Sequence, residues 1–164
     1  MVSEAVRIAT LNAYGILDTP NEAAFDRIVR DMAIAFRVRS ALVSFIDERR
    51  QWYKARVGID DPFVARSISF CTRSIDVDHV TVVPDARAHP VFGSNPFVTG
   101  PLGVRFYAAA PIKALNRARI GTVCVFDPEP RADGLSERAK RQLSSFAAQV
   151  TEALETRRLD QRRA

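Results

Sequence analysis

Four side chains carry the strongest potential for nucleophilic, redox or metal chemistry: Cys71, Cys124, His79 and His89. If a short helix begins at Ser69, Cys71 lies in its first turn, where backbone amides favour a thiolate. The alternative is inert packing, because free cysteines are among the most buried residues. Neither histidine forms a recognisable motif with Cys71, and the four residues lack the spacing of metal ligands. We therefore predict no catalytic residue and no metal site, and keep a thiol-dependent redox enzyme that uses Cys71 as the alternative.

A second group of residues combines aromatic walls with a base, an acid and an amide, which suits a small polar or aromatic ligand in an apolar cleft. These residues come from an irregular segment (60–78), a loop rich in proline and glycine (84–103) and an alternating strand (104–112). A loop of this length in a small domain is usually functional or mobile. The predicted ligand-binding residues are Phe70, Cys71, Asp85, Phe92, Asn95, Arg105 and Tyr107. An internal ion pair between Arg105 and Asp85, which would pin the loop onto the sheet, is the alternative for those two.

The elements that must position these residues follow from periodicity and capping. Helical spacing predicts a short helix over 4–14, a helix from the N-cap Asn21 to about residue 36, and a long helix over 136–160 that is capped by Ser136. Apolar or alternating runs predict five strands, over 41–46, 51–56, 80–83, 104–112 and 120–126. Alternation places Val104 with Phe106 on one face of its strand, and Arg105 with Tyr107 on the other. The element order predicts an α+β domain with an antiparallel sheet.

Composition bounds the class of protein. A chain of 164 residues, 47% hydrophobic and 26% charged, is the size of one globular domain, so we expect a single domain over 1–164. The net charge is +5, of which Arg157, Arg158, Arg162 and Arg163 against Asp160 supply +3. Basic residues at a helix C-terminus complement its carbonyls, and the other arginines are scattered, so we do not expect a nucleic-acid partner. No apolar run reaches the length of a membrane span, and we expect a cytoplasmic protein.

The apolar stripe of the last helix leaves two possibilities open. Leu143, Phe146, Val150 and Leu154 form a narrow row that could dock on the sheet, pair with the same helix of another copy, or do both. We predict that these four residues form a homodimer interface, or that the helix continues into a linker.

Several short motifs, taken in order, resemble the bacterial GAF domain of the type found with histidine kinases and diguanylate cyclases. The resemblance covers about residues 7–158. Its motifs are GILDTP at 15–20, FD at 25–26, DERRQWYK at 47–54, SFC at 69–71, VPDA at 83–86, NPFV at 95–98, RFYA at 105–108 and GTVCVFD at 121–127. The resemblance implies a six-stranded antiparallel sheet, with the terminal helices on one face and a loop-covered ligand cleft on the other.

The same resemblance implies a sensory function, in which a small molecule in the cleft shifts the terminal helices and the shift reaches a partner or an output domain. Specialised members of the family differ from this sequence. The cyclic-nucleotide signature is not traceable, Cys71 is followed by Thr72 rather than the histidine usual in bilin-binding members, and two cysteines do not reproduce the cluster of free methionine-R-sulfoxide reductases. The ligand and any cofactor stay unnamed. The alternative to a sensor or a thiol enzyme is an interaction module whose cleft is filled by its own side chains.

Overall fold

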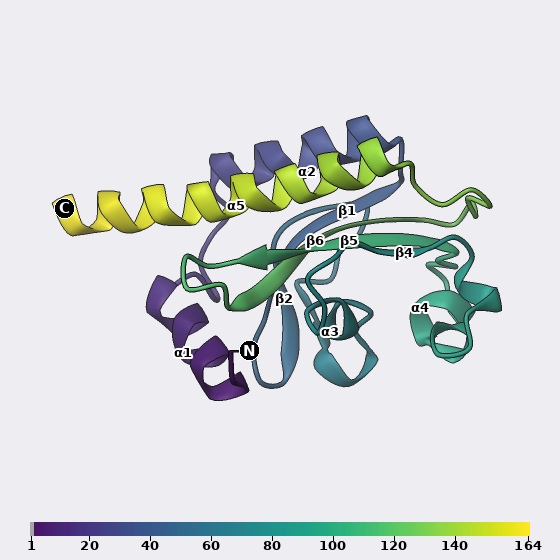
Figure 1. The fold of residues 1–164 in the computed structure, drawn as a ribbon, viewed down its shortest axis with the longest axis horizontal. Helices are drawn as coiled ribbons and strands as arrows, with labels where there is room; N and C mark the ends of the chain where they lie inside the picture. Colours follow the sequence, from purple (N-terminus) through teal and green to yellow (C-terminus); the bar gives the residue numbers. More distant parts are fainter. Residues whose placement is uncertain (1) are drawn as a thin grey trace.

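The computed structural model describes residues 2–164 as a central antiparallel sheet with helices on both faces (Figure 1). Within that range the sheet has six strands in the order β3-β2-β1-β6-β5-β4. The strands are β1 (Ser40–Ile46), β2 (Arg50–Val57), β3 (Phe63–Ala65), β4 (Thr81–Val83), β5 (Phe106–Lys113) and β6 (Arg119–Asp127). The helices are α1 (Glu4–Tyr14), α2 (Ala23–Phe36), α3 (Cys71–Ser74), α4 (Pro96–Thr99) and α5 (Glu137–Arg163), with short 3-10 turns at Arg66–Ile68, Ala86–Ala88 and Phe92–Ser94.

Two antiparallel hairpins, β1–β2 and β5–β6, build the sheet, and β1 joins them by pairing with β6. The apolar or alternating runs predicted all four of these strands. The six strands confirm the number implied by the family resemblance and correct the five derived from periodicity. The missed strand is β3, which has three residues and is too short to show an alternating pattern.

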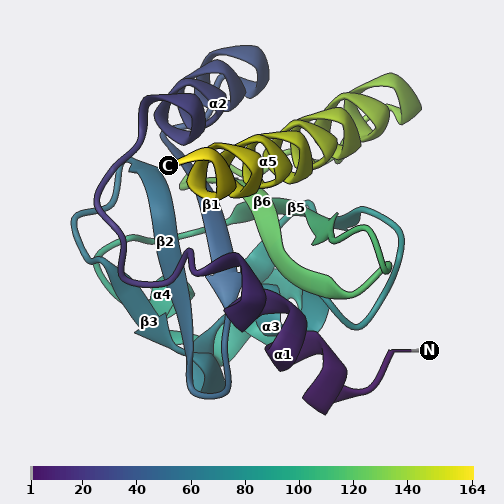
Figure 2. The same cartoon turned by 90° about the vertical axis from the view of Figure 1, so that its left-hand side faces the viewer.

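Helices α2 and α5 lie side by side on one face of the sheet (Figures 1 and 2). Ser136 caps α5 as expected, since its hydroxyl accepts a hydrogen bond from the Ala139 amide at 3.1 Å. Helix α2 begins at Ala23, and Glu22 rather than Asn21 precedes it without a side-chain cap.

The apolar stripe of α5 docks on the sheet of its own chain. Leu143, Phe146, Val150 and Leu154 are buried among side chains of α2 and the central strands. The prediction that these four residues form a dimer interface is therefore corrected, because a side chain buried in its own core is not on the surface that meets another chain. Burying them supplies about 1.5–3 kcal/mol each by transfer from water.

Helix α1 lies at the end of the sheet (Figure 1), and its last residue, Tyr14, contacts the distal part of α5. Its Arg7 is buried and donates to the Ile46 carbonyl oxygen at 2.6 Å. Thr10 accepts a hydrogen bond from the Asn116 amide in the β5–β6 turn at 3.0 Å. These contacts join the N-terminal helix to both hairpins.

The opposite face of the sheet is covered by short elements, α3, α4 and the loops between them (Figure 1). They enclose a second apolar core, separate from the one under α2 and α5. Val104 belongs to this second core, together with Tyr107, whereas Phe106 belongs to the first. The expectation that Val104 and Phe106 share a face is wrong because β5 begins only at Phe106, so strand alternation does not extend back to Val104.

Candidate functional site

A small cavity lies inside the second core, between the sheet and the loops that cover it. It measures about 20 Å³, which is room for a single water molecule. Strands β1, β2, β5 and β6 form its floor, while α3, α4 and the segment before β5 form its roof. The lining residues are Leu42, Gln51, Tyr53, Phe70, Cys71, Phe97, Val104, Tyr107, Cys124 and Phe126.

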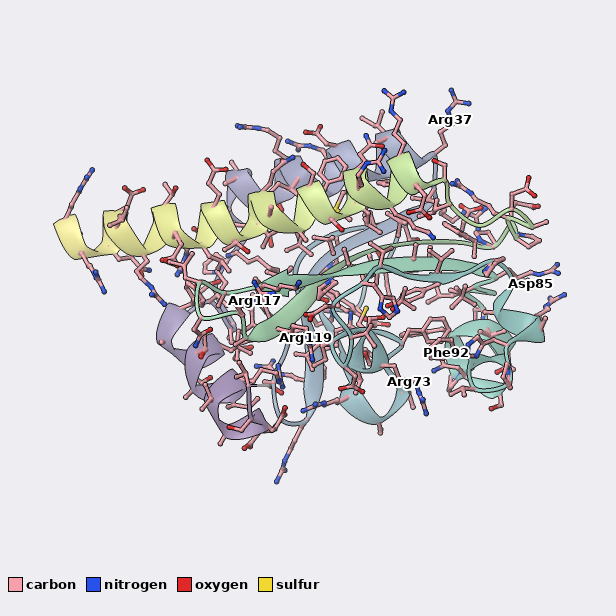
Figure 3. All side chains as sticks on the ribbon, viewed as in Figure 1. Arg37, Arg73, Asp85, Phe92, Arg117 and Arg119 are labelled. Carbon is pink, nitrogen blue, oxygen red and sulfur yellow. The ribbon has the colours of Figure 1, made fainter. Side chains whose placement is uncertain are left out.

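Aromatic rings close the cavity from the outside. The Phe70 ring stacks on Phe92 with centroids 4.3 Å apart, and its edge meets Phe97 at 6.2 Å. Tyr107, from the floor, meets Phe70 edge-on at 5.0 Å. Aromatic pairs in these geometries add about 0.5–1.5 kcal/mol beyond the burial of their area. Phe92 projects on the side of the sheet away from α5 (Figure 3).

A hydrogen-bonded group of three side chains lies at the base of α3. The Tyr107 hydroxyl is 2.9 Å from the Cys71 sulfur and 3.0 Å from the Ser74 hydroxyl, and all three are buried. Burial raises the pKa of Tyr107 well above its usual 10.0. The phenol is therefore neutral and fixes α3 to β5.

A second polar chain crosses the floor. The Ser69 hydroxyl donates to the side-chain oxygen (Oε1) of Gln51 at 2.6 Å, and the side-chain nitrogen (Nε2) of Gln51 donates to the Ser44 hydroxyl at 2.9 Å. The Ser44 hydroxyl lies 3.1 Å from that of Thr122. Strands β1 and β6 can approach closely here because residue 121 is a glycine. A side chain at Gly121 would clash with the Ser44 carbonyl oxygen. Among residues 2–164, every buried side-chain nitrogen and oxygen has a hydrogen-bond partner, so the closed site is satisfied without a ligand.

The two thiols share this environment. Burial raises the pKa of the Cys71 thiol, but hydrogen bonds with Cys124, Thr122, Tyr107 and Gln51 lower it by more, so the net shift is downward. Burial raises the pKa of Cys124 well above its usual 9.0. Cys71 is the first residue of α3, near the position expected for it, and Ser69 accepts from the Thr72 amide at 3.2 Å. Its sulfur is nevertheless buried, and a buried thiol is closed to a substrate in solution.

The predicted ligand-binding residues separate into three groups. Phe70, Cys71 and Tyr107 line the cavity, and Phe92 packs directly behind Phe70. Asn95 holds the roof together through its side chain. Its Nδ2 donates to the Ile68 carbonyl oxygen at 2.7 Å, and its Oδ1 accepts from the Phe97 backbone amide at 2.9 Å.

Asp85 and Arg105 lie outside the cavity and bind each other. The Arg105 guanidinium donates to both carboxylate oxygens of Asp85, at 3.1 and 2.7 Å. Asp85 lies at the edge of the molecule in Figure 3. The hydrogen bond from Arg105 holds the pKa of Asp85 below its usual 3.8. The structure thus shows the internal ion pair that the sequence left open, and this pair ties the loop to the strand that follows it.

The predicted site lacked seven of the ten lining residues and three further members of the polar chain in the floor: Leu42, Gln51, Tyr53, Phe97, Val104, Cys124 and Phe126 in the lining, and Ser44, Ser69 and Thr122 in the chain. A signal for two of them was present. Ser44 and Thr122 interrupt otherwise apolar central strands, and a polar side chain in a strand covered on both faces needs a buried partner. Gln51 and Tyr53 are separated by one residue in β2, so they share a face.

The sequence model of the GAF domain matches residues 20–154 of this chain. The chain belongs to the GAF domain family. It is 36% identical over 155 residues to a cyclic di-GMP phosphodiesterase of Pseudomonas aeruginosa, a match that covers 94% of this chain and 26% of that protein. The chain therefore spans about a quarter of the length of that relative.

Solved structures confirm the fold. The GAF domain of a phosphoenolpyruvate-protein phosphotransferase from Acinetobacter has a TM-score of 0.66 and 17% identity, with 99% of both chains covered. A free methionine-R-sulfoxide reductase from Neisseria meningitidis has a TM-score of 0.67 and 15% identity, covering 98% of this chain and 96% of that one. The PixJ GAF domain of Thermosynechococcus elongatus has a TM-score of 0.67 and 16% identity, covering 85% and 88%.

No helix within residues 2–164 combines the length and apolarity needed to cross a membrane. The same residues contain no group of three or more histidine, cysteine, aspartate or glutamate side chains placed to hold a metal ion.

Proposed function

We propose that this GAF domain is a cytoplasmic sensor that takes up a small molecule at the cavity between α3 and the sheet. The observation that carries the proposal is a cavity with a rigid floor of central strands and an aromatic roof of short elements. Binding sites are commonly built from loops held on a rigid scaffold. The proposed ligand-contacting residues are Gln51, Tyr53, Phe70, Cys71, Phe97 and Tyr107.

Uptake of a ligand requires the roof to open. A cavity of about 20 Å³ is far smaller than the roughly 300–1,000 Å³ of sites that hold metabolites. Phe70, Phe92 and Phe97 come from short helices and turns, which are held by fewer hydrogen bonds than the sheet. A ligand would therefore replace these ring contacts with its own and hold the roof in an open position, and its affinity would be lowered by the cost of opening.

The output of the sensor is proposed from the relative. A protein named as a cyclic di-GMP phosphodiesterase contains a segment similar to this chain, which supports a role in regulating a signalling enzyme. The proposed partners are a second copy of the chain and a histidine kinase or diguanylate cyclase output. A homodimer would use the outer surfaces of α2 and α5, because the inner stripe of α5 is buried.

A ligand-free interaction module is the second candidate. The observation in its favour is the satisfied, filled core, which needs no ligand to complete its hydrogen bonds. A thiol enzyme is less well supported, because Cys71 would need the same opening before any substrate reached it.

A thermal-shift screen of small metabolites, including nucleotides, tests the sensor directly. We expect a compound that raises the Tm of the wild-type chain progressively as its concentration increases, since a ligand that binds only the folded state stabilises it. The Gln51→Ala variant should lose this response, while Arg105→Ala, the matched control outside the cavity, should keep it. A screen without a stabilising compound, or equal stabilisation of both variants, would favour the interaction module.

A further inference from the structure

Strand β2 has the cavity on one side and the helix layer on the other, and it contains a β-bulge at Lys54. Tyr53 and Ala55 pair with adjacent residues of β1, so Lys54 between them is an extra residue without a partner on that strand. A bulge bends its strand and redirects the side chains beside it. Tyr53 lines the cavity, whereas the Lys54 ammonium lies 5.4 Å from the centre of the Phe25 ring of α2. Tyr53 and Lys54 lie on opposite faces by ordinary strand alternation, and the bulge keeps both Lys54 and Ala55 on the helix side of the sheet.

The Lys54 ammonium is fully buried and has three acceptors, all from the connector between α1 and α2 (residues 15–22). It donates to the Thr19 hydroxyl at 2.8 Å, the Pro20 carbonyl at 2.6 Å and the Glu22 carboxylate at 2.6 Å. Its side chain is 0% exposed. A buried ammonium that lost its carboxylate would be strongly unfavourable, so the connector must follow β2 wherever the bulge moves.

Glu22 also binds α5. The Arg157 guanidinium donates to the same carboxylate at 2.9 Å and to the Tyr14 carbonyl at 3.2 Å. The same turn of α5 makes two more contacts with Tyr14. The Tyr14 hydroxyl donates to the Glu155 carboxylate at 2.8 Å, and the Arg158 guanidinium lies 4.1 Å from the centre of the Tyr14 ring. The distal part of α5 is therefore held by polar contacts with Tyr14 and the connector as well as by the buried Leu154, whereas its first part is held by the apolar core.

These two attachments differ in strength. The Lys54 side chain is sealed from solvent, whereas the side chains of Glu22 and Arg157 are 36% and 15% exposed. A guanidinium near the surface can exchange its carboxylate for water at low cost, and a buried ammonium cannot. A displacement of β2 would accordingly carry the connector with it and loosen or shift the distal part of α5.

We propose that Lys54, Glu22 and Arg157 form a relay that transmits displacement of β2 at the cavity to the distal part of α5. The relay rests on the proposed sensor function, because it supplies the route by which an event at the cavity reaches the terminal helix. It is a positioning device: none of its three residues lines the cavity.

Amide hydrogen exchange of the 164-residue chain, resolved by peptide, tests the relay without any ligand. In Lys54→Met we expect exchange of residues 151–158 to accelerate at least tenfold, while residues 140–148 change less than twofold. Lys140→Gln, which removes the exposed pair with Glu137 at the start of the same helix, is the matched control and should change neither segment. If Lys54→Met does not fold, Glu22→Gln, whose side chain is partly exposed, takes its place with the same expectation.

The cavity end of the relay is tested with two substitutions that both remove atoms from the cavity wall. Tyr53→Leu lies on β2 next to the bulge, whereas Val104→Ala lies on the segment before β5. We expect Tyr53→Leu to accelerate exchange of residues 151–158 at least fivefold and Val104→Ala to leave it unchanged. In the Lys54→Met background, Tyr53→Leu should add nothing.

Equal effects of Tyr53→Leu and Val104→Ala, uniform acceleration along α5, or no effect of Lys54→Met and Glu22→Gln on residues 151–158 would each overturn the relay. These outcomes are independent of the ligand screen. If the exchange experiments support the relay but the screen finds no stabilising compound, only the sensor function is contradicted. If the screen finds a ligand but the exchange experiments fail, only this route from the cavity to α5 is contradicted.

Discussion

The two faces of the sheet are built from the same strands but by different means. The face under α2 and α5 is apolar except for the buried Lys54 and is covered by helices of 14 and 27 residues. The cavity face is covered by helices of four residues and by turns, and it buries hydroxyls, thiols and an amide. Long amphipathic helices maximise apolar burial, whereas short elements over a polar floor can open locally. The helix face supplies stability, and the cavity face carries the proposed function.

The largest expected effect lies on the helix face. Leu143→Ala should lower the free energy of unfolding by about 3 kcal/mol, because it leaves a cavity in a fully buried position that the sheet and α2 cannot collapse to fill. Urea denaturation measures it. Leu115→Ala, at an exposed apolar position, is the control and should change stability by less than about 0.5 kcal/mol. A cost near 1 kcal/mol for Leu143→Ala would remove the distinction between the two faces.

A smaller effect is expected from the polar floor. Tyr107→Phe should cost about 1–2 kcal/mol, since it leaves the buried Cys71 and Ser74 groups without their shared partner. Ser74→Ala removes one of the same bonds, so the double variant should cost less than the sum of the two single ones. Strict additivity, measured by the same denaturation experiment, would show that the three groups do not act together.

An acid-dependent effect is expected where the helix layer meets β2. Burial raises the pKa of Glu22, but hydrogen bonds from Lys54 and Arg157 lower it by more, so its folded value lies below the usual 4.5. A carboxylate with a depressed folded pKa stabilises the fold above its unfolded pKa, and this contribution disappears as the pH falls below about 4.5. The stability difference between wild type and Glu22→Gln should therefore be largest near pH 7 and shrink below pH 4.5. A difference that does not vary with pH would mean that the ionised carboxylate is not the stabilising form.

The smallest effect is expected at the rim of the cavity face. Asp85 and Arg105 are partly exposed, and ion pairs of this kind contribute little to stability. Arg105→Ala should leave the urea midpoint within experimental error, and added salt should not change that result. A clear loss of stability would show that the pair holds the roof closed.

Most of the fold was predictable because its elements are long or strongly patterned. The α5 stripe, the two central hairpins and the Ser136 cap all follow from local periodicity and capping chemistry. The stripe could not reveal what it contacts, since an apolar row suits the chain's own sheet as well as a second copy. The family resemblance predicted the sixth strand. Periodicity could not predict β3, because three residues are too few to show an alternating pattern.

The candidate site was predictable only in part. Phe70 and Cys71 were found because aromatic and thiol side chains are conspicuous in an irregular segment, and Tyr107 because strand alternation turned it away from the core face. Arg105 was placed with Tyr107 by an alternation that assumed a strand starting two residues too early. Gln51 depends on partners from two other segments, and such pairing leaves no local pattern in the sequence.

Native-state hydrogen exchange of the wild-type chain at increasing urea concentrations tests the difference between the two faces most directly. Our account predicts that amides of the roof, in residues 92–104, exchange through local opening, with a free energy well below that of global unfolding and little dependence on urea. Amides of β6 and of the first half of α5 should exchange only through global unfolding. If the roof amides also exchanged only through global unfolding, the cavity face would be as closed as the helix face, and uptake of a ligand through its roof would be contradicted.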